Sequence, residues 1–402
     1  MTKFSEKFFC PLPWTHMYYQ TNSPSPCHLI KNTDFNITPK EYLNSDWLKK
    51  IKKDMVSGVA PEACRTCSSK EKLGLKSTRG AAWGYYGVGE EPHYEDRWFY
   101  NKFDENSKNE FKRIEIRFSN LCNMKCRMCN ELSSSEWLKE KIEHKLPYIK
   151  SPQKEGYENE SVLKMKDASV EQLKQIALES PNLKHICFTG GEPFIIKEYY
   201  EYMDFLIENK LNEDMLLEIF TNCSVYNPHI VDRLRQFKDV VFVMSIDGVG
   251  KTAEYIRHGQ QWNKVEKNIL QFNKLEKPFN IYFNTAISSY VLLDVSSLAK
   301  FLMQLYSENN SIQTKCYYTF EPKFVNFENL PAHLRPKAID EIEKAIEILS
   351  APNFKILTTE LNTIKKYLLE NQPVNPQLFI DKTKQLDAIR GENFEEVFGI
   401  KL

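Results

Sequence analysis

The sequence predicts an α/β fold with a parallel sheet, because strand-like and helical patterns alternate through its central part. Six short runs rich in apolar and β-branched residues are strand candidates, at 113–118, 184–189, 216–221, 240–246, 280–287 and 314–320. Six stretches with the apolar spacing of a helix lie between them, at 133–144, 169–179, 197–209, 228–236, 262–275 and 294–306. This alternation is typical of βα units, which place successive strands parallel to one another.

The length of 402 residues exceeds one average domain. We expect an N-terminal module over residues 1–105, a central α/β domain over 106–320 and a helical extension over 321–402. Hydrophobic residues make up 42% and aromatic residues 13% of the chain, which is enough for a substantial core. Lys and Arg together number 54, as do Asp and Glu, so we do not expect nucleic acid as a partner.

The N-terminal stretch Met1–Tyr19 contains Lys3, Glu6 and Lys7, which is not the pattern of a signal peptide. No apolar run approaches the roughly 20 residues that a membrane-spanning helix needs. We therefore expect a soluble, cytoplasmic protein without a membrane partner.

Ten cysteines in such a chain favour metal binding over disulfides. Three of them, Cys122, Cys126 and Cys129, follow the first predicted strand with the spacing C-x3-C-x2-C. Three thiolates at this spacing can hold three corners of a cubane iron–sulfur cluster and leave its fourth iron open, as a catalytic metal site requires. A zinc site is the alternative, but no fourth Cys or His follows before His144.

This motif after a first strand resembles the signature of the radical S-adenosylmethionine (SAM) enzymes. The resemblance implies an incomplete (β/α)6 barrel, a catalytic [4Fe–4S] cluster on the three cysteines, and SAM bound to the open iron through its amino and carboxylate groups. One electron from the cluster would then split SAM to a 5′-deoxyadenosyl radical. In the family an aromatic residue usually precedes the third cysteine and packs near the adenine; here it is Met128, an adaptable apolar side chain.

The second predicted strand leads into Gly190, Gly191, Glu192 and Pro193. Two glycines let the backbone approach a ligand, and a carboxylate beside them can hold an ammonium group. The run resembles the family's site for the SAM amino group, which assigns that role to Glu192 and the two glycines. An ordinary turn before a helix is the alternative.

Two later strand ends and the run 255–259 resemble other parts of the family's SAM site. Asn222 would lie near SAM, Ser245 or Asp247 would bind its ribose, and Arg257 would pair with its carboxylate. A surface arginine after a capped helix is the alternative for Arg257. Cys223 stands where the family usually has glycine, either as a small filler or as a thiol near the chemistry.

Two further cysteines, Cys187 and Cys316, fall in predicted strands, so we interpret both as core residues, with Cys316 also a candidate for the pocket wall.

The N-terminal module contains four more cysteines, Cys10, Cys27, Cys64 and Cys67, which can fill all four positions of a second site. Spacing alone fits either structural zinc or an auxiliary [4Fe–4S] cluster. The prolines and Trp14 around these cysteines resemble the module of twitch-type radical SAM proteins, relatives of the SPASM group, which implies the auxiliary cluster. We place His28 outside the ligand set.

The C-terminal segment predicts three amphipathic helices, at 336–349, 354–371 and 376–390. No cysteine follows Cys316, so the C-terminal cluster-binding extension of SPASM proteins is not expected. The run 386–394 resembles the tail of twitch-type members, and we assign it to closing the open side of the barrel, without chemistry.

The resemblance implies an enzyme that abstracts hydrogen from a substrate, which we expect to be a peptide or protein. A small molecule such as a sugar or amino acid derivative is the alternative substrate. The electron donor would be a flavodoxin or ferredoxin. A zinc-stabilised binding protein without catalytic activity is the competing hypothesis from another functional class.

Overall fold

The computed structural model describes residues 8–20, 23–30, 37–72, 77–84, 104, 107–147 and 169–402. The chain divides into two compact units, each described here by itself. The first comprises Met1–Ser119, Gln153–Phe188 and Glu198–Leu216, and the second comprises Asn120–Pro152, Thr189–Lys197 and Leu217–Leu402. The domain boundaries expected near residues 105 and 320 stay a prediction.

Four strands of the first unit are paired in the order β2-β1-β3-β4. Their bounds are His16–Gln20 for β1, Ser23–Ser25 for β2, Arg113–Arg117 for β3 and His185–Phe188 for β4. β1 runs antiparallel to β2 and parallel to β3, and β3 runs parallel to β4. The predicted strands 113–118 and 184–189 are confirmed, whereas β1 and β2 were not predicted.

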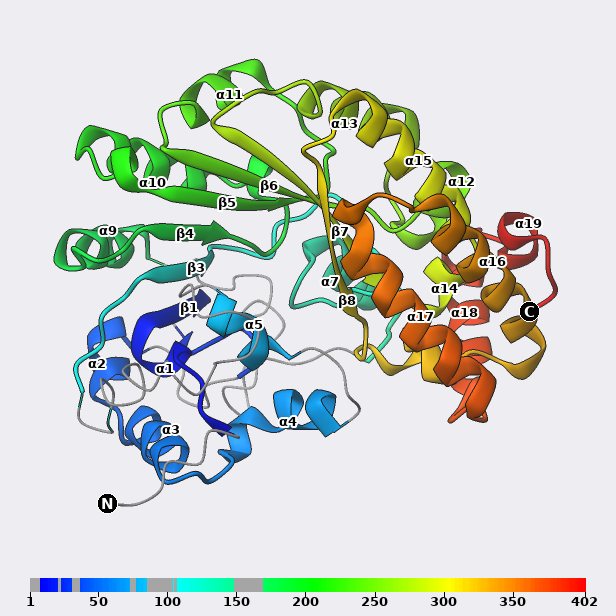
Figure 1. The fold of residues 1–402 in the computed structure, drawn as a ribbon, viewed down its shortest axis with the longest axis horizontal. Helices are drawn as coiled ribbons and strands as arrows, with labels where there is room; N and C mark the ends of the chain where they lie inside the picture. Colours follow the sequence, from blue (N-terminus) through cyan, green and yellow to red (C-terminus); the bar gives the residue numbers. More distant parts are fainter. Residues whose placement is uncertain are drawn as a thin grey trace. The chain divides into compact units, whose positions relative to one another are not determined.

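Helices of the first unit gather next to β1 and along β4 (Figure 1). They are α1 (Leu12–Thr15), α2 (Pro39–Asn44), α3 (Asp46–Val56), α4 (Arg65–Lys72), α5 (Thr78–Gly84), α9 (Val170–Glu179) and α10 (Lys197–Glu208). The side chain of Ser45 caps α3 by accepting a hydrogen bond from the Leu48 amide. Phe118 and Phe188 pack on Tyr199 of α10, with ring centroids 4.8 and 4.5 Å apart, and this contact anchors the helix on the sheet.

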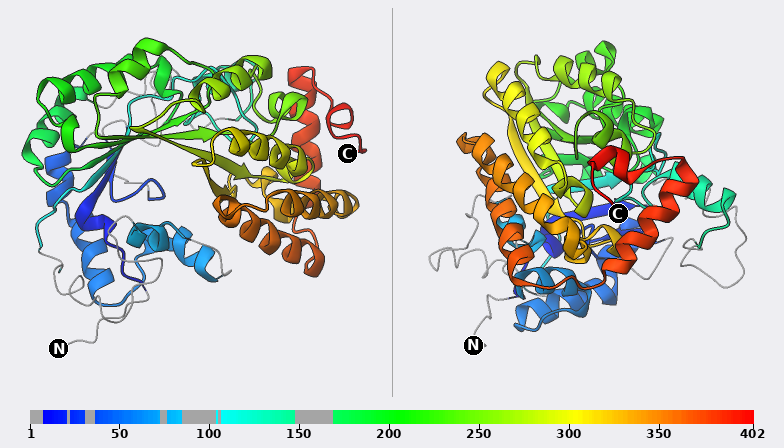
Figure 2. Two further views of the ribbon diagram at one scale, coloured as in Figure 1. Left: turned by 45° about the horizontal axis from the view of Figure 1, so that its top comes forward. Right: turned by 90° about the vertical axis from the view of Figure 1, so that its right-hand side faces the viewer.

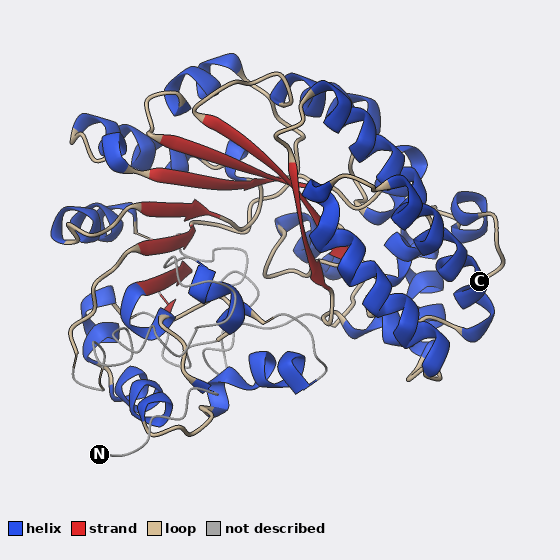
Figure 3. Cartoon of the chain, in the orientation of Figure 1, coloured by secondary structure: helices blue, strands red, loops and turns tan. Residues whose placement is uncertain are grey.

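The strands of the second unit follow the order β5-β6-β7-β8. They are β5 (Leu216–Thr221), β6 (Asp239–Ser245), β7 (Phe279–Ile287) and β8 (Gln313–Tyr318), drawn in red in Figure 3. β6, β7 and β8 run parallel, with Ser245 opposite Asn284 and Ala286 opposite Tyr317. All four agree with the predicted strands to within two residues, so the α/β fold is confirmed, while its closure into a partial barrel stays a prediction.

Helices α11, α13 and α15 lie along one side of β6 and β7, and the C-terminal helices gather beyond them (Figure 2). The helices of this unit are α7 (Ser135–Glu143), α11 (Pro228–Leu234), α12 (Gly250–Ile256), α13 (Trp262–Phe272), α14 (Ser289–Leu292), α15 (Val295–Glu308), α16 (Arg335–Ile348), α17 (Lys355–Glu370), α18 (Pro376–Arg390) and α19 (Phe394–Phe398). The three predicted C-terminal helices are confirmed.

The two faces of these strands differ in character, because side chains alternate along a strand. One face is apolar and includes the buried Phe242 and Phe283. On the other face Lys315 donates a 2.8 Å hydrogen bond to the buried Glu218 and lies 4.6 Å from the centre of the Tyr282 ring. The second face is therefore suited to polar ligands.

Across the described ranges, no helix combines the length and apolar character that crossing a membrane requires.

Candidate active site

Residues 121–130, here called the cysteine loop, follow β3 and bring Cys122, Cys126 and Cys129 together. The thiols of Cys126 and Cys129 share a hydrogen bond, and Cys122 lies close enough to interact with both electrostatically. Burial raises the pKa of Cys122 to about 12. The hydrogen bond with Cys129 lowers the pKa of Cys126 to about 7 and raises that of Cys129, so one of the two thiols readily becomes a thiolate ligand.

Hydrogen bonds from neighbouring segments fix the shape of the cysteine loop. The Lys125 amide donates to the carbonyl of His258 at 2.9 Å, and the Arg127 amide donates to the carbonyl of Ile256 at 2.8 Å. The indole of Trp137 donates to the carbonyl of Cys126 at 2.6 Å. The loop is thus held in place on both sides of Cys126.

Gly191 allows the turn after β4 to lie against the cysteine loop. Its φ is +43°, and a Cβ atom there would lie 2.1 Å from the carbonyl oxygen of Leu121. Next to it the Glu192 amide donates to that same carbonyl at 2.9 Å. Gly190 also has a left-handed backbone, with φ +76°. Glycine is therefore required at 191 by both the backbone angle and the close approach.

The carboxylate of Glu192 is fully buried and accepts three hydrogen bonds. Its donors are the amide of Asn222 at 2.6 Å, the hydroxyl of Thr221 at 2.9 Å and the amide of Phe194 at 3.2 Å. Burial nevertheless raises the pKa of Glu192 to about 7. A cation arriving beside it would favour the ionised form.

Asn222 and Cys223 follow β5 and contact the cysteine loop from another direction. The Asn222 side chain donates to Asn123 at 2.9 Å and lies 4.0 Å from the Cys122 sulfur. Cys223 is buried, with a left-handed φ of +60°. Glycine adopts such an angle without strain, whereas cysteine does so at a cost.

Asp247 and Arg257 form a buried ion pair beside Cys126. The Asp247 carboxylate also accepts a 2.7 Å hydrogen bond from the Ala286 amide, and Nη1 of Arg257 lies 3.8 Å from the Cys126 sulfur. Burial raises the pKa of Asp247 although Arg257 opposes the shift. The alternative interpretation of Arg257 as a surface arginine is wrong, because the residue is only 8% exposed.

The remaining predicted residues lie at the margin of this group. Met128 is buried within the cysteine loop, and Ser245 is half-buried at the end of β6, two residues before Asp247. Tyr317, on β8, was not predicted. It is 46% exposed, and it interacts electrostatically with Asp247, Cys129 and Arg257. Tyr317 lies opposite Ala286 in the sheet, and the Ala286 amide donates to Asp247. This strand register brings Tyr317 to the site.

These residues fit a cluster with an open iron and a zwitterionic ligand. Three thiols lie together, and Nε of the buried Arg257 has no hydrogen-bond partner within the described part of the chain. That atom is suited to an incoming carboxylate. Among described residues, no three Cys, His, Asp or Glu are arranged to hold a single metal ion. Cubane ligands bind separate irons, so their sulfurs need not converge on one point.

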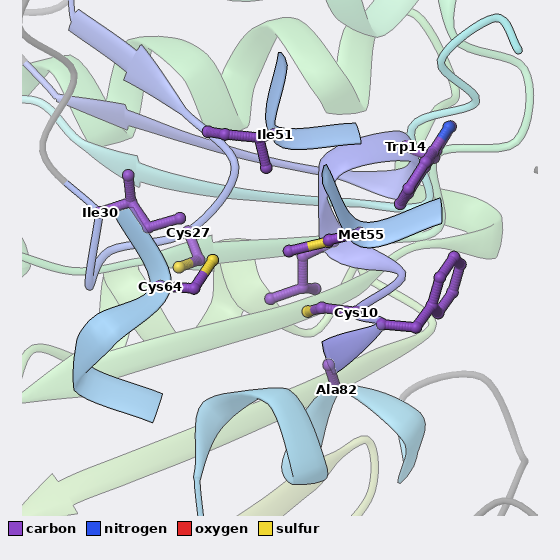
Figure 4. Close-up of a cluster of buried hydrophobic side chains, with 10 residues drawn as sticks. Cys10, Trp14, Cys27, Ile30, Ile51, Met55, Cys64 and Ala82 are labelled. Carbon is purple, nitrogen blue, oxygen red and sulfur yellow. The ribbon is translucent and has the colours of Figure 1, made fainter. Parts of the chain in front are cut away.

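A second group of cysteines lies in the first unit. Cys10, Cys27, Cys64 and Cys67 are buried and line one small pocket with Met55. Figure 4 shows the side chains of Cys27 and Cys64 pointing toward one another, with Cys10 and Met55 nearby. Burial raises the pKa of Cys64 to about 12. The four thiols therefore share one apolar environment.

Arg79 and His28 lie next to these cysteines. Arg79 lines the pocket and is fixed by Glu71 through hydrogen bonds of 2.9 Å from Nε and Nη2. His28 is half exposed and lies 3.3 Å from Glu115. Its place outside the ligand set stays a prediction.

Residues 116–288 match the family model described as the radical SAM superfamily. This range covers less than half of the chain. The matched range includes the cysteine loop and every residue of the site in the second unit except Tyr317.

Similar solved structures share little sequence with this chain. "Native anSMEcpe with bound AdoMet and Cp18Cys peptide" is 17% identical with a TM-score of 0.36, over 58% of this chain and 59% of that chain. "Crystal structure of Streptococcus suis SuiB bound to precursor peptide SuiA" is 12% identical with a TM-score of 0.40, over 86% of this chain and 73% of that chain. "Structure of TYW1 with a lysine-pyruvate adduct bound" is 14% identical with a TM-score of 0.35, over 72% and 89%.

The chain spans about three fifths of the length of anSMEcpe. No match was found among curated proteins.

Proposed function

We propose that this protein is a radical SAM enzyme whose catalytic [4Fe–4S] cluster is held by Cys122, Cys126 and Cys129. The observation that carries the proposal is the gathering of these thiols with Glu192 and Arg257 in one buried site. When bound, the cluster would supply the electron that splits SAM, and the resulting 5′-deoxyadenosyl radical would abstract hydrogen from the substrate.

The two charged residues of the site are suited to opposite ends of the SAM amino acid. Arg257 is oriented by Asp247, which leaves its Nε to donate to the carboxylate. Glu192 and the backbone of Gly190 and Gly191 would hold the ammonium. Burial raises the pKa of Glu192 to about 7. The positive charge of the ammonium would lower this pKa again and so favour the carboxylate.

Residues at the strand ends and in the cysteine loop would bind the nucleoside part of SAM. Ser245 or Asp247 would contact the ribose, Met128 would pack near the adenine, and Asn222 would lie close to both SAM and Cys122. Asp247 already holds Arg257 and the Ala286 amide, so Ser245 is the freer of the two for the ribose.

A second [4Fe–4S] cluster on Cys10, Cys27, Cys64 and Cys67 is part of the proposal. Its support is the shared burial of four thiols around one pocket, in a module that resembles the twitch type. Structural zinc on the same four thiols is the competing hypothesis.

The proposed substrate is a peptide or protein, with a flavodoxin or ferredoxin as electron donor. The polar face of the second unit, with Glu218, Tyr282 and Lys315, supplies partners for backbone amides and charged side chains. A small polar molecule would use the same groups and is the alternative. The twitch subtype and the cytoplasmic location stay predictions.

Anaerobic reconstitution tests the proposal directly. Two cubanes require about eight iron atoms per chain and a brown protein. Incubation with SAM and dithionite should then yield 5′-deoxyadenosine. A colourless protein with stoichiometric zinc and no SAM cleavage would contradict the assignment.

Deuterium transfer distinguishes the two substrate classes. A substrate deuterated at the reacting carbon should pass the label to 5′-deoxyadenosine. Peptides and polar small molecules are tested in parallel, and transfer only from a small molecule would overturn the peptide assignment.

A further inference from the structure

Residues 387–392, here called the C-terminal brace, include the last turn of α18 and the start of the link to α19. They contact the cysteine loop at Arg127 and the helix α7 at Glu140. Both contacts lie within the second unit. They connect segments about 250 to 265 residues apart in the sequence. The sequence had suggested only a structural role for this tail.

The first contact surrounds Arg127, which stands between Cys126 and Cys129. Its fully buried guanidinium donates to Asp387 at 2.6 Å and to Glu392 at 2.5 Å. It also lies 3.7 Å from the centre of the Tyr255 ring, and the Tyr255 hydroxyl donates to the same Asp387 oxygen at 2.8 Å. Arg127 is therefore fixed by charge and by stacking at once.

Glu392 extends this contact to a second support of the loop. Its other carboxylate oxygen lies 2.7 Å from Nδ1 of His258. The carbonyl of His258 in turn accepts the 2.9 Å hydrogen bond from the Lys125 amide. The brace thus reaches the residues on both sides of Cys126.

The second contact is centred on Glu140 of α7. Arg390 donates to both of its carboxylate oxygens, at 3.1 and 2.8 Å, and Lys125 lies 2.7 Å from one of them. Arg390 also stacks 4.7 Å from the Trp137 ring, whose indole holds the Cys126 carbonyl. The Arg390 and Glu140 side chains are both fully buried.

The charges of the two contacts balance. Lys125, Arg127 and Arg390 carry three positive charges, and Glu140, Asp387 and Glu392 carry three negative ones. Removing one partner of a buried ion pair leaves an uncompensated charge, which is strongly destabilising. Without the brace, the cation of Arg127 would stand alone beside two cluster ligands.

We propose that the C-terminal brace positions the catalytic cluster: Asp387, Arg390 and Glu392 hold the cysteine loop in its ligating shape and neutralise Arg127 next to it. They act through Arg127, His258 and Glu140 and are positioning residues. This inference rests on the proposed function only for the identity of the group that the loop holds.

The first test uses the cluster-free protein and so does not depend on that identity. The variant Asp387→Asn/Glu392→Gln keeps the shape of both side chains and removes both charges. Alkylation of Cys122 and Cys126 by iodoacetamide, followed by mass spectrometry, should become at least several-fold faster than in the unmodified protein. Cys223, which is buried in the same unit, serves as an internal reference.

A matched control is Asp340→Asn, which removes one partner of an exposed pair with Lys344 on α16. Alkylation should not change in this variant. Unchanged rates in the double variant would overturn the proposal. An equal rise at Cys223 would also overturn it, because the brace would then stabilise the whole unit rather than the loop.

The second test measures the midpoint potential of the cluster. In the reconstituted double variant, the uncompensated cation should move the midpoint potential of the SAM-responsive cluster to a more positive value, because positive charge favours the reduced form. Adding Arg127→Met should move it back toward that of the unmodified protein. A potential equal in all three proteins would contradict the electrostatic part of the proposal. Failure of the unmodified protein to take up a cluster would instead contradict the proposed function.

Discussion

Gly191 shows how one residue sets the distance between two segments of the site. Its left-handed backbone and the 2.1 Å approach of a built Cβ to the Leu121 carbonyl each exclude a side chain. Gly250 has a similar φ of +54° but no atom within 4 Å of a built Cβ. Substitutions at the two positions therefore distinguish the cost of backbone strain from the cost of a steric clash.

Gly191→Ala should destabilise the cluster-free protein by about 2–5 kcal/mol, since a steric clash adds to the left-handed strain. Gly250→Ala should cost about 1 kcal/mol, from the strain alone. Urea unfolding of both variants measures the difference. Equal losses would mean that the turn moves away from the loop at no cost.

Cys223 occupies a left-handed position that glycine would adopt without strain. Cys223→Gly should change the free energy of unfolding by no more than about 1 kcal/mol, because relief of strain offsets the lost burial of a small side chain. SAM cleavage should persist. Loss of 5′-deoxyadenosine formation with normal iron content would show that the thiol takes part in the chemistry.

The carboxyl of Glu192 gives the cluster-free protein a dependence of stability on pH. Its pKa rises from 4.5 in the unfolded chain to about 7 in the fold, so the folded state retains a proton that the unfolded state releases. Stability should therefore fall as the pH rises from about 4.5 to about 7, by up to ~3 kcal/mol.

In Glu192→Gln this part of the pH dependence should disappear. Urea unfolding at pH 5, 6 and 7 measures the slope in both proteins. An equal slope in the variant would place the titrating group elsewhere.

Elements with strong local patterns were predicted well from the sequence. The helix 376–390 was placed at its observed bounds, and β5 to β8 were placed within two residues, because their periodicity and flanking turns are local properties. β1 was missed because its pairing with β3 joins His16 to Arg113, a contact that no local pattern encodes.

The second cluster is tested by removing one of its four proposed ligands, which are Cys10, Cys27, Cys64 and Cys67. Cys64→Ala should lower the iron content by about one cubane, about four atoms, while SAM cleavage by dithionite continues. Iron analysis after anaerobic reconstitution measures the loss. Cys187→Ala, which changes a buried cysteine of β4 outside both groups, is the control and should keep the full iron content.

Across the whole molecule, the two proposed clusters belong to different compact units. Cys126→Ala should therefore abolish formation of 5′-deoxyadenosine and remove about four iron atoms, leaving the cluster of the first unit in place. Iron analysis and product assay on one preparation measure both effects. Retained turnover would remove the catalytic assignment, and loss of all the iron would mean that the units are coupled.

The candidate site was predictable where it depends on short motifs. The cysteine spacing and the Gly190–Glu192 run identify the residues that the fold brings together. The pairing of Asp247 with Arg257 and the burial of Arg127 were not predictable, because the partners of each charge are known only from the tertiary structure. The chemistry of a charged residue depends on those partners.

The bond between Arg127 and Glu392 spans 265 residues of sequence, and this separation has a consequence for biosynthesis. A ribosome produces the cysteines long before it produces the acidic residues that steady them. Until then, the nascent loop carries a cation without its counter-ions. We therefore expect the loop to take up a cluster only after residues 387–392 have been synthesised and have folded against it.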